Sequence, residues 1–225
     1  MNATGISNNH NAFYNNHFYN GAVAISLYNS SNQLADSTTI VGNIFENQLS
    51  RGIDLQYHNN VLIDKNTLTT NATYTSYIGI ILSRVYQGSR VTNNKITGSN
   101  GYALYLNVVQ SSQTNPTIIA NNFLQSNGAT ATMYNYFSSN IHIYHNNINQ
   151  VSTNTTSSGL RLSSGDSTVI RNNIIVANLS YAIHTNNSFN ILESNYNNLY
   201  TSGSNLGYYG GSIASDLATW QTISS

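Results

Sequence analysis

Residues 52–68 read GIDLQYHNNVLIDKNTL and contain two patterns that recur along this chain of 225 residues. The second half of the stretch places Asn66 between two apolar residues, in the order apolar-x-x-Asn-x-apolar. The first half places Ile53 and Leu55 two residues apart, which is the spacing of a strand with one buried face. Recurring patterns of this kind indicate a repeat architecture.

The asparagine pattern recurs at intervals of 23 to 28 residues, at Asn16, Asn43, Asn66, Asn94, Asn121, Asn146, Asn172 and Asn197. The paired apolar pattern lies between these asparagines, at Ile25/Leu27, Ile53/Leu55, Ile80/Leu82, Leu104/Leu106, Leu160/Leu162 and Ile183/Thr185, with an irregular member around Met133. Short strands of this kind cannot each bury an apolar face alone. Stacked coils, about 4.8 Å apart, would pair each strand with its counterpart one repeat later. The repeat therefore predicts an all-β solenoid of about eight coils with two short strands per repeat.

Each repeated asparagine falls where the chain must bend between two strands. Asparagine tolerates the left-handed backbone conformation better than most residues. Stacked asparagine side chains can also form a hydrogen-bonded ladder from coil to coil. We therefore expect these residues to build the coils rather than to bind a ligand.

The chain resembles the right-handed parallel β-helix repeat in two stretches, residues 52–68 and residues 159–174. That repeat is shared by the pectin-lyase-like superfamily and by carbohydrate-binding and sugar-hydrolase domains of the NosD type. The resemblance covers about residues 6–200. It implies a right-handed single-stranded parallel β-helix over residues 1–200.

Residues 201–225 differ from the repeat and are expected to form a loop and a short capping helix, with Ser215 as its N-cap. Leu217 and Trp220, three residues apart, are expected to share one helical face over the last coil. This tail resembles segments that close β-helix units in large secreted surface proteins of the Bacteroidota type. Because solenoid ends are normally capped and no N-terminal cap is evident, we expect the chain to be part of a longer polypeptide. Loops leaving the rod are expected at 69–77, 110–114 and 149–158.

Charged residues make up only 6% of the chain, and the net charge is zero. Clustered cations are needed to bind phosphates, so a nucleic acid is not an expected partner. No apolar stretch reaches the length of a membrane span, and membrane insertion is not expected. The chain has no cysteine, which excludes disulfides and thiolate metal sites.

One outward position per coil lies between the two inward residues of the paired pattern. We call its members Tyr105, Tyr134, Arg161 and His184 the outward stripe, and we expect them to follow one another on successive coils. Aromatic rings flanked by hydrogen-bonding groups suit sugars, so the stripe is a candidate glycan surface. The alternative is that these tyrosines only pair across neighbouring strands and fill a half-exposed face. A second column places His145 beside Arg171, either as an anion site or as a solvated surface pair.

Enzymes that cleave polysaccharides need acidic side chains in a particular arrangement. Glycoside hydrolysis requires two carboxylates about 5–10 Å apart, and no two acids of this chain fall in one column on adjacent coils. Asp54 resembles the aspartate of uronan-epimerase active sites, although Leu55-Gln56 follows it where those sites have Pro-His. No metal site or cofactor is expected, and calcium would enter only if the protein were a lyase.

The sequence therefore leads to three hypotheses of different classes. The first is an extracellular or cell-surface module that acts as a rigid spacer or adhesin and binds a polysaccharide or cell-surface glycan. The second is a polysaccharide lyase, glycoside hydrolase or uronan epimerase, with its remaining catalytic groups on coils outside this chain. The third is a phage tail-fibre β-helix.

Overall fold

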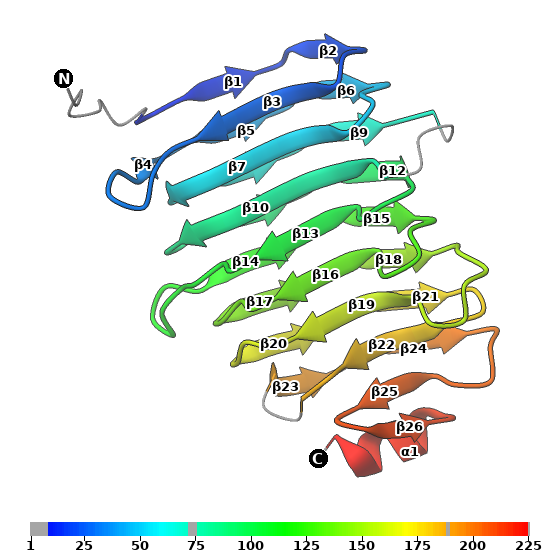
Figure 1. Ribbon diagram of the computed structural model, residues 1–225. Coiled ribbons are helices and arrows are strands. Elements are labelled where there is room, and N and C mark those ends of the chain that lie inside the picture. Colours follow the sequence, from blue (N-terminus) through cyan, green and yellow to red (C-terminus); the bar gives the residue numbers. More distant parts are fainter. Residues whose placement is uncertain (1–8, 72–75, 188–189, 225) are drawn as a thin grey trace.

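A computed structural model describes residues 9–71, 76–187 and 190–224, and the expected loop at 69–77 lies partly outside these residues. The chain winds into a rod of stacked coils (Figure 1). The described residues form three sheets, two of eight strands and one of ten. Strands in the two eight-stranded sheets follow one another in chain order, so each coil adds one strand to each sheet. The predicted solenoid of about eight coils is confirmed, but each coil contains three strands rather than two.

Sheet A holds the strands that precede the asparagine bend: β1 (Ala12–Tyr14), β5 (Thr39–Val41), β8 (Leu62–Asp64), β11 (Arg90–Thr92), β14 (Thr117–Ala120), β17 (Ile141–Tyr144), β20 (Thr168–Arg171) and β23 (Ile191–Asn195). Sheet B holds the strands that follow it: β2 (His17–Tyr19), β6 (Ile44–Glu46), β9 (Thr67–Thr69), β12 (Lys95–Ser99), β15 (Phe123–Ser126), β18 (Asn147–Gln150), β21 (Ile174–Ala177) and β24 (Asn198–Thr201). Sheet C holds β3 (Val23–Tyr28), β4 (Ala35–Asp36), β7 (Arg51–Asn59), β10 (Ile78–Tyr86), β13 (Leu104–Asn107), β16 (Met133–Tyr136), β19 (Ser158–Ser163), β22 (Tyr181–Thr185), β25 (Gly207–Tyr209) and β26 (Ser212–Ala214).

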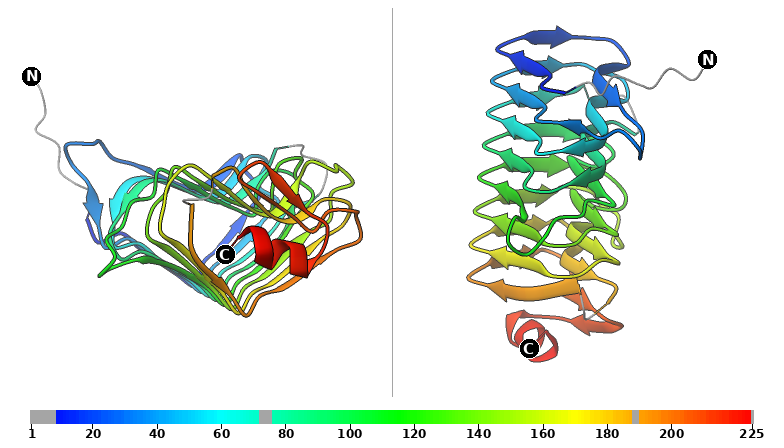
Figure 2. Two further views of the ribbon diagram at one scale, coloured as in Figure 1. Left: turned by 90° about the horizontal axis from the view of Figure 1, so that it is seen from below. Right: turned by 90° about the vertical axis from the view of Figure 1, so that its left-hand side faces the viewer.

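Sheets A and B meet at the bend and form a V that sheet C closes, which gives the rod a triangular cross-section (Figure 2). All strand pairs are parallel except β25 with β26. The inward residues of the three sheets fill the interior, where Ile53, Leu55 and Leu82 are fully buried. The core is therefore one apolar column that runs the length of the rod.

The asparagine ladder is continuous along the bend. Each ladder asparagine donates from its side-chain amide to Oδ1 of the next one, at 2.9 to 3.0 Å. The ladder consists of Asn16, Asn43, Asn66, Asn94, Asn122, Asn146, Asn173 and Asn197. The predicted ladder is thus confirmed, with two members displaced by one residue.

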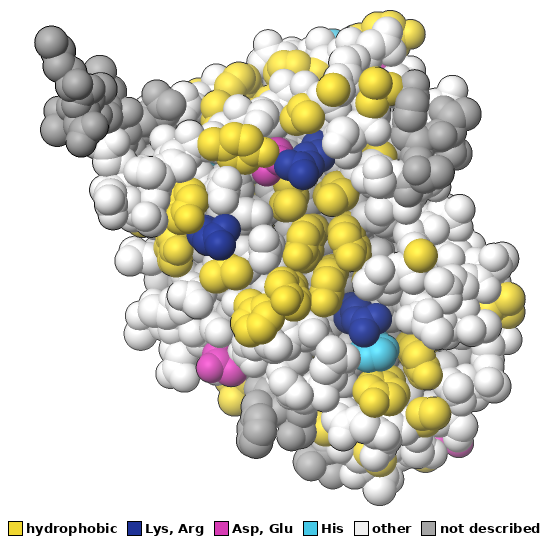
Figure 3. All heavy atoms as spheres, viewed as in Figure 1, with side chains coloured by type: hydrophobic (Ala, Val, Ile, Leu, Met, Phe, Trp, Pro, Cys, Tyr) yellow, Lys and Arg dark blue, Asp and Glu magenta, His cyan; other side chains and the backbone are white. Residues whose placement is uncertain are grey.

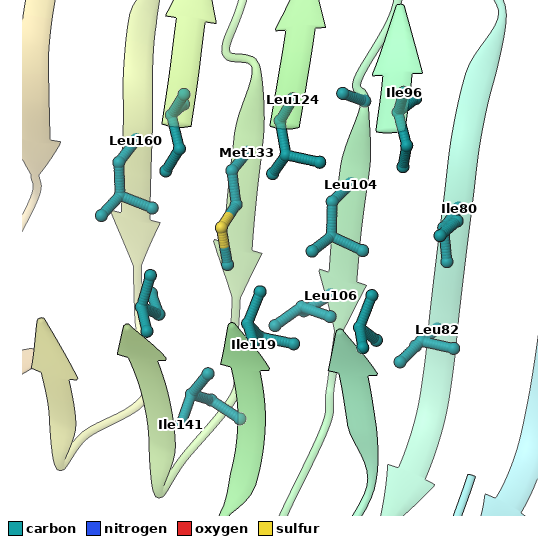
Figure 4. Packing of buried hydrophobic residues seen from close by; sticks show 14 of the residues in the cluster. Ile80, Leu82, Ile96, Leu104, Leu106, Ile119, Leu124, Met133, Ile141 and Leu160 are labelled. Atoms are coloured by element: carbon teal, nitrogen blue, oxygen red, sulfur yellow. The ribbon is translucent and has the colours of Figure 1, made fainter. Parts of the chain in front are cut away.

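In the fifth coil the ladder residue is Asn122, and the prediction of Asn121 is wrong. Ile119 and Leu124 are the buried neighbours, whereas Phe123 is exposed; Figure 4 shows Ile119 and Leu124 within the core. The same displacement occurs two coils later, where Asn173 rather than the predicted Asn172 joins the ladder. At both places two consecutive asparagines each fit the apolar-x-x-Asn-x-apolar pattern.

The left-handed backbone conformation belongs to the residue before each ladder asparagine. Asn93, Asn121 and Asn172 have φ of 56°, 57° and 56°, and Gly42 occupies the same position with φ of 70°. The two roles that we assigned to one asparagine are therefore divided between neighbouring residues. One residue turns the chain and the next one forms the ladder.

The tail closes the C-terminal end of the rod. Strands β25 and β26 form a hairpin that continues sheet C, where a loop was expected. Helix α1 (Leu217–Ile223) follows, and its N-cap is Asp216, which accepts a hydrogen bond from the Thr219 amide at 2.8 Å. The prediction of Ser215 as the N-cap is wrong, because the helix begins one residue later.

Trp220 is the residue of α1 that covers the last coil. Its ring lies so close to Gly207 that a Cβ there would come within 2.6 Å of it. Ile223 packs against the core beside it, while Leu217 is exposed. Leu217 and Trp220 lie beside the same residues of the last coil, but Trp220 is buried and Leu217 remains about half exposed, so Trp220 and Ile223 do most of the covering.

Candidate functional site

The outward stripe lies on sheet C as predicted. Tyr105 on β13 is the register partner of Tyr134 on β16, which is in turn the partner of Arg161 on β19. Arg161 is the partner of His184 on β22. Because parallel in-register strands project partner side chains from the same face, the four groups form one row along the rod.

The tyrosines of the stripe form a packed aromatic cluster. The rings of Tyr105 and Tyr134 stack with centroids 5.4 Å apart and planes 12° from parallel. Tyr102 and Tyr136, which sequence reasoning missed, extend the cluster at 4.9 Å from Tyr105 and 5.6 Å from Tyr134. In Figure 3 a band of hydrophobic-class side chains, which include tyrosine, crosses this face obliquely. The two stripe tyrosines thus each turn one ring face toward the other.

Burial within this cluster changes the pKa of the Tyr105 phenol. Desolvation raises the pKa of Tyr105 to about 12, and the neighbouring tyrosines add to the effect. The phenol is therefore neutral at physiological pH and can donate a hydrogen bond from its hydroxyl. It is not a candidate base in this state.

Arg161 and His184 form the polar end of the stripe. Among the described residues Arg161 forms no ion pair, and its Nε is buried without a hydrogen-bond partner. His184 is only 9% exposed, and its Nε2 lies 2.8 Å from Oδ1 of Asn186. Burial and, to a smaller extent, the adjacent Arg161 lower the pKa of His184 to about 4. The imidazole is neutral at pH 7, so the guanidinium carries the charge of this end.

Tyr208 extends the row by one coil. It is the register partner of His184, and the two ring centroids are 4.5 Å apart. Tyr181 approaches both rings from the side, at 5.4 Å from His184. The sequence signal for Tyr208 was weak, because Gly207 takes the inward position that Ile183 and Leu160 occupy in the two preceding coils.

Asp54 lies in the same register column, three coils before Tyr134. Its side chain is almost completely buried, forms an ion pair with Arg51 and accepts a hydrogen bond from the Tyr28 hydroxyl. Asp64 lies on sheet A and therefore on another face. Both contacts are made by Oδ2 of Asp54, and among the described residues no second carboxylate lies beside it in its register column.

The second predicted pair is wrong in its register. Arg171 is the partner of Tyr144 rather than of His145, and it forms an ion pair with Glu193 on the adjacent strand. Sequence reasoning missed the small cluster around it, in which the Tyr144 hydroxyl lies 2.9 Å from Nδ1 of His142. Since Glu193 already neutralises the guanidinium, the cluster is not an anion site.

Acidic groups do not gather elsewhere. No two of the seven acids occupy partner positions on neighbouring strands. Across residues 9–71, 76–187 and 190–224 no group of three histidine or acidic side chains is arranged to hold a metal ion. The one helix in these ranges is too short and too polar to cross a membrane.

The fold and its outer face define a right-handed parallel β-helix with a row of aromatic and polar groups along one sheet. Residues 2–154, more than half of the chain, match the family model described as "Right handed beta helix region", and the chain belongs to this family. The search of curated proteins found no match. No comparison supports the resemblance of the tail to surface proteins of the Bacteroidota.

Among solved structures, the chain is similar to the A-module of mannuronan C-5 epimerase AlgE6 from Azotobacter vinelandii. The identity is 11% and the TM-score is 0.35, with 86% of this chain and 59% of that chain covered. The chain thus spans less than two thirds of that structure. This likeness is too distant to carry an argument about activity.

Proposed function

We propose that this protein is a non-catalytic β-helix module that binds a polysaccharide along the outward stripe. It would act as a rigid spacer or adhesin outside the cell or at its surface. The observation that carries the proposal is the in-register row of Tyr105, Tyr134, Arg161 and His184 on sheet C. A row that repeats at about 4.8 Å matches an extended, repetitive ligand laid along the rod.

The groups of the row suit sugar hydroxyls. Ring edges and phenol hydroxyls of the stacked tyrosines offer apolar contact and hydrogen-bond donors. Arg161 adds a planar fork of donors that is not occupied by any carboxylate in the described structure. The absence of a carboxylate pair on neighbouring strands favours binding without turnover.

Binding can be tested by pull-down on insoluble polysaccharides and by titration with alginate and polygalacturonate. We expect the double variant Tyr105→Ala/Tyr134→Ala to bind at least about tenfold more weakly, because two aromatic contacts are lost. Tyr200→Ala removes an exposed tyrosine of sheet B and is the matched control, expected to bind as the wild type. Unchanged binding by the double variant would show that the stripe only fills its face.

Turnover is measured in the same samples, with and without calcium. Absorbance of unsaturated products reports a lyase, and new reducing ends report either a lyase or a hydrolase. A uronan epimerase releases neither, so the proton NMR spectrum of recovered alginate is compared before and after incubation. We expect no change in any readout. Turnover that disappears in Arg161→Ala or Asp54→Asn would contradict the proposal and establish a carbohydrate-active enzyme.

A further inference from the structure

A separate pocket lies at the edge of sheet C, between the loop of residues 29–34 and the loop of residues 110–115. Its volume is about 480 Å³, which is within the range of small-molecule sites. It lies near the carboxyl ends of β7 and β10, which supply Asn59 and Tyr86. The pocket is therefore distinct in position from the outward stripe.

Its floor is a short row of three side chains from consecutive coils. Tyr86 is the register partner of Asn59 on one side and of Gln110 on the other. The row places a phenol ring between two carboxamides at about 4.8 Å intervals. Among the described residues no other aromatic ring contacts Tyr86, in contrast to the mutually stacked tyrosines of the stripe. A ring face of Tyr86 is therefore not covered by another aromatic side chain.

The carboxamides of this floor are available for new hydrogen bonds. Oδ1 of Asn59 is buried and has no hydrogen-bond partner within the described part of the chain. A buried acceptor in this condition costs about 1–3 kcal/mol. Within the described part of the chain, Gln110 and Gln87 form hydrogen bonds through their backbone groups. A ligand hydroxyl or a water molecule would satisfy these groups.

The wall of the pocket is held in place by its backbone. The Gln110 amide donates to the Val85 carbonyl at 2.9 Å, and the Gln87 amide donates to the Gln110 carbonyl at 3.2 Å. At the tip of the loop the Asn115 amide donates to the Ser112 carbonyl at 3.2 Å. The Ser111 carbonyl accepts from the Asn140 side chain at 2.6 Å. The pocket is thus largely formed before any ligand arrives.

All side chains that line the pocket are uncharged, and most carry an amide or a hydroxyl group. Such a lining offers donors and acceptors in similar number but no counter-ion for a carboxylate or a sulfate. We propose that this pocket binds a neutral sugar unit, with one sugar face on Tyr86 and its hydroxyls on Asn59 and Gln110. The pocket does not depend on the outward stripe, and it gives the module a second binding site, which is specific for uncharged sugars.

The test is an NMR titration of the whole chain, labelled with ¹⁵N, that follows the side-chain amide signals of Asn59 and Gln110. The probes are neutral hexasaccharides of glucose, mannose, galactose and xylose, with trigalacturonate as the acidic counterpart. We expect at least one neutral hexasaccharide to shift both signals at millimolar concentration. No shift with any of the four, or a stronger response to trigalacturonate, would overturn the proposal.

Two variants locate the binding. Gln110→Ala and Tyr86→Ala are each expected to weaken binding of the responding hexasaccharide, Tyr86→Ala by about tenfold. The matched control is Tyr200→Ala on sheet B, outside both proposed sites, and it is expected to leave this titration unchanged. Tyr134→Ala, in the stripe, tests whether the two sites are separate. Equal weakening by Tyr134→Ala and by the pocket variants would overturn the assignment to a separate site. If only the proposal for the stripe is wrong, the side-chain amide signals of Asn59 and Gln110 will still shift on titration. The two proposals can therefore fail independently.

Discussion

The asparagine bend and the outward stripe are both columns that run along the rod, yet they differ in how the sequence occupies them. The bend uses asparagine in every described coil, and each ladder side chain is bonded to its neighbours. The stripe column changes from Asp54 through Ile81 and Tyr105 to Arg161 and His184. A column that is required for folding carries the same residue type in each coil. A column on the outer face of a sheet is free to carry varied chemistry, and this difference leads to three predictions.

The largest effect is expected from breaking the ladder. In Asn94→Ala, the backbone amide of Asn66 loses its acceptor on Asn94, and the side-chain amide of Asn66 keeps only the Ile40 carbonyl. The Ile63 carbonyl loses the donor that Asn94 supplies. Buried groups left without partners cost about 1–3 kcal/mol each. We therefore expect a loss of roughly 3–5 kcal/mol in the free energy of unfolding. Urea denaturation followed by circular dichroism measures it.

The neighbouring residue provides the control. Asn93 has φ of 56° and donates to Asp64 at the surface. Since glycine adopts this conformation without strain, Asn93→Gly is expected to change stability by less than about 1 kcal/mol. Equal losses in the two variants would show that the bend, rather than the ladder, holds the coils together.

An intermediate effect is expected from pH, through His184 in the stripe. The pKa of this imidazole is about 4 in the folded protein and about 6.5 in an unfolded chain. The folded state therefore binds fewer protons between these values. Stability is greatest above pH 6.5 and is lost as the pH falls toward 4, by up to roughly 1.4 kcal/mol per pH unit.

Denaturation midpoints of the wild type and of His184→Gln between pH 7 and 4 measure this dependence. Glutamine cannot titrate, so the variant should show a flatter profile over the same range. Other groups contribute equally to both proteins. Parallel profiles would mean that His184 is not the group responsible.

The smallest effect on stability is expected from the stripe tyrosines themselves. Tyr134→Thr keeps a good strand former on β16 and removes the ring contacts with Tyr105, Tyr102 and Tyr136, of which the cross-strand pair with Tyr105 contributes roughly 0.2–1 kcal/mol. We expect a loss within that range, together with weakened polysaccharide binding. A loss comparable to that of Asn94→Ala, without a change in binding, would place the stripe in the same structural class as the bend.

Much of this architecture could be predicted from the sequence, because its signals are local. The alternation at Ile53/Leu55 and its counterparts identified the buried face of sheet C, and it also gave the outward column in correct register through Tyr134. The prediction of the ladder residue failed where two consecutive asparagines both satisfied the apolar-x-x-Asn-x-apolar pattern. At Asn121–Asn122 and again at Asn172–Asn173, either asparagine has apolar residues three before and two after it.

Other doublets were unambiguous. At Asn93–Asn94 only the second asparagine has apolar residues, Val91 and Ile96, at the required positions. The pocket around Tyr86 gave no signal in the sequence at all. Its parts come from four coils, and the residues that join them, such as Gln110, lie in loops whose lengths differ from one coil to the next.

The sequence alone determined that this chain is a stack of β coils, that asparagine marks the bend, and which residues of sheet C point outward. These features depend on period-two alternation and on a spacing that recurs along the chain. Tertiary structure alone decided which asparagine of a doublet joins the ladder, because neighbouring coils must supply its partners. It also decided that the tail continues sheet C under Trp220, and that Asn59, Tyr86 and Gln110 meet in one pocket. Each of these depends on contacts between coils that a single repeat does not contain.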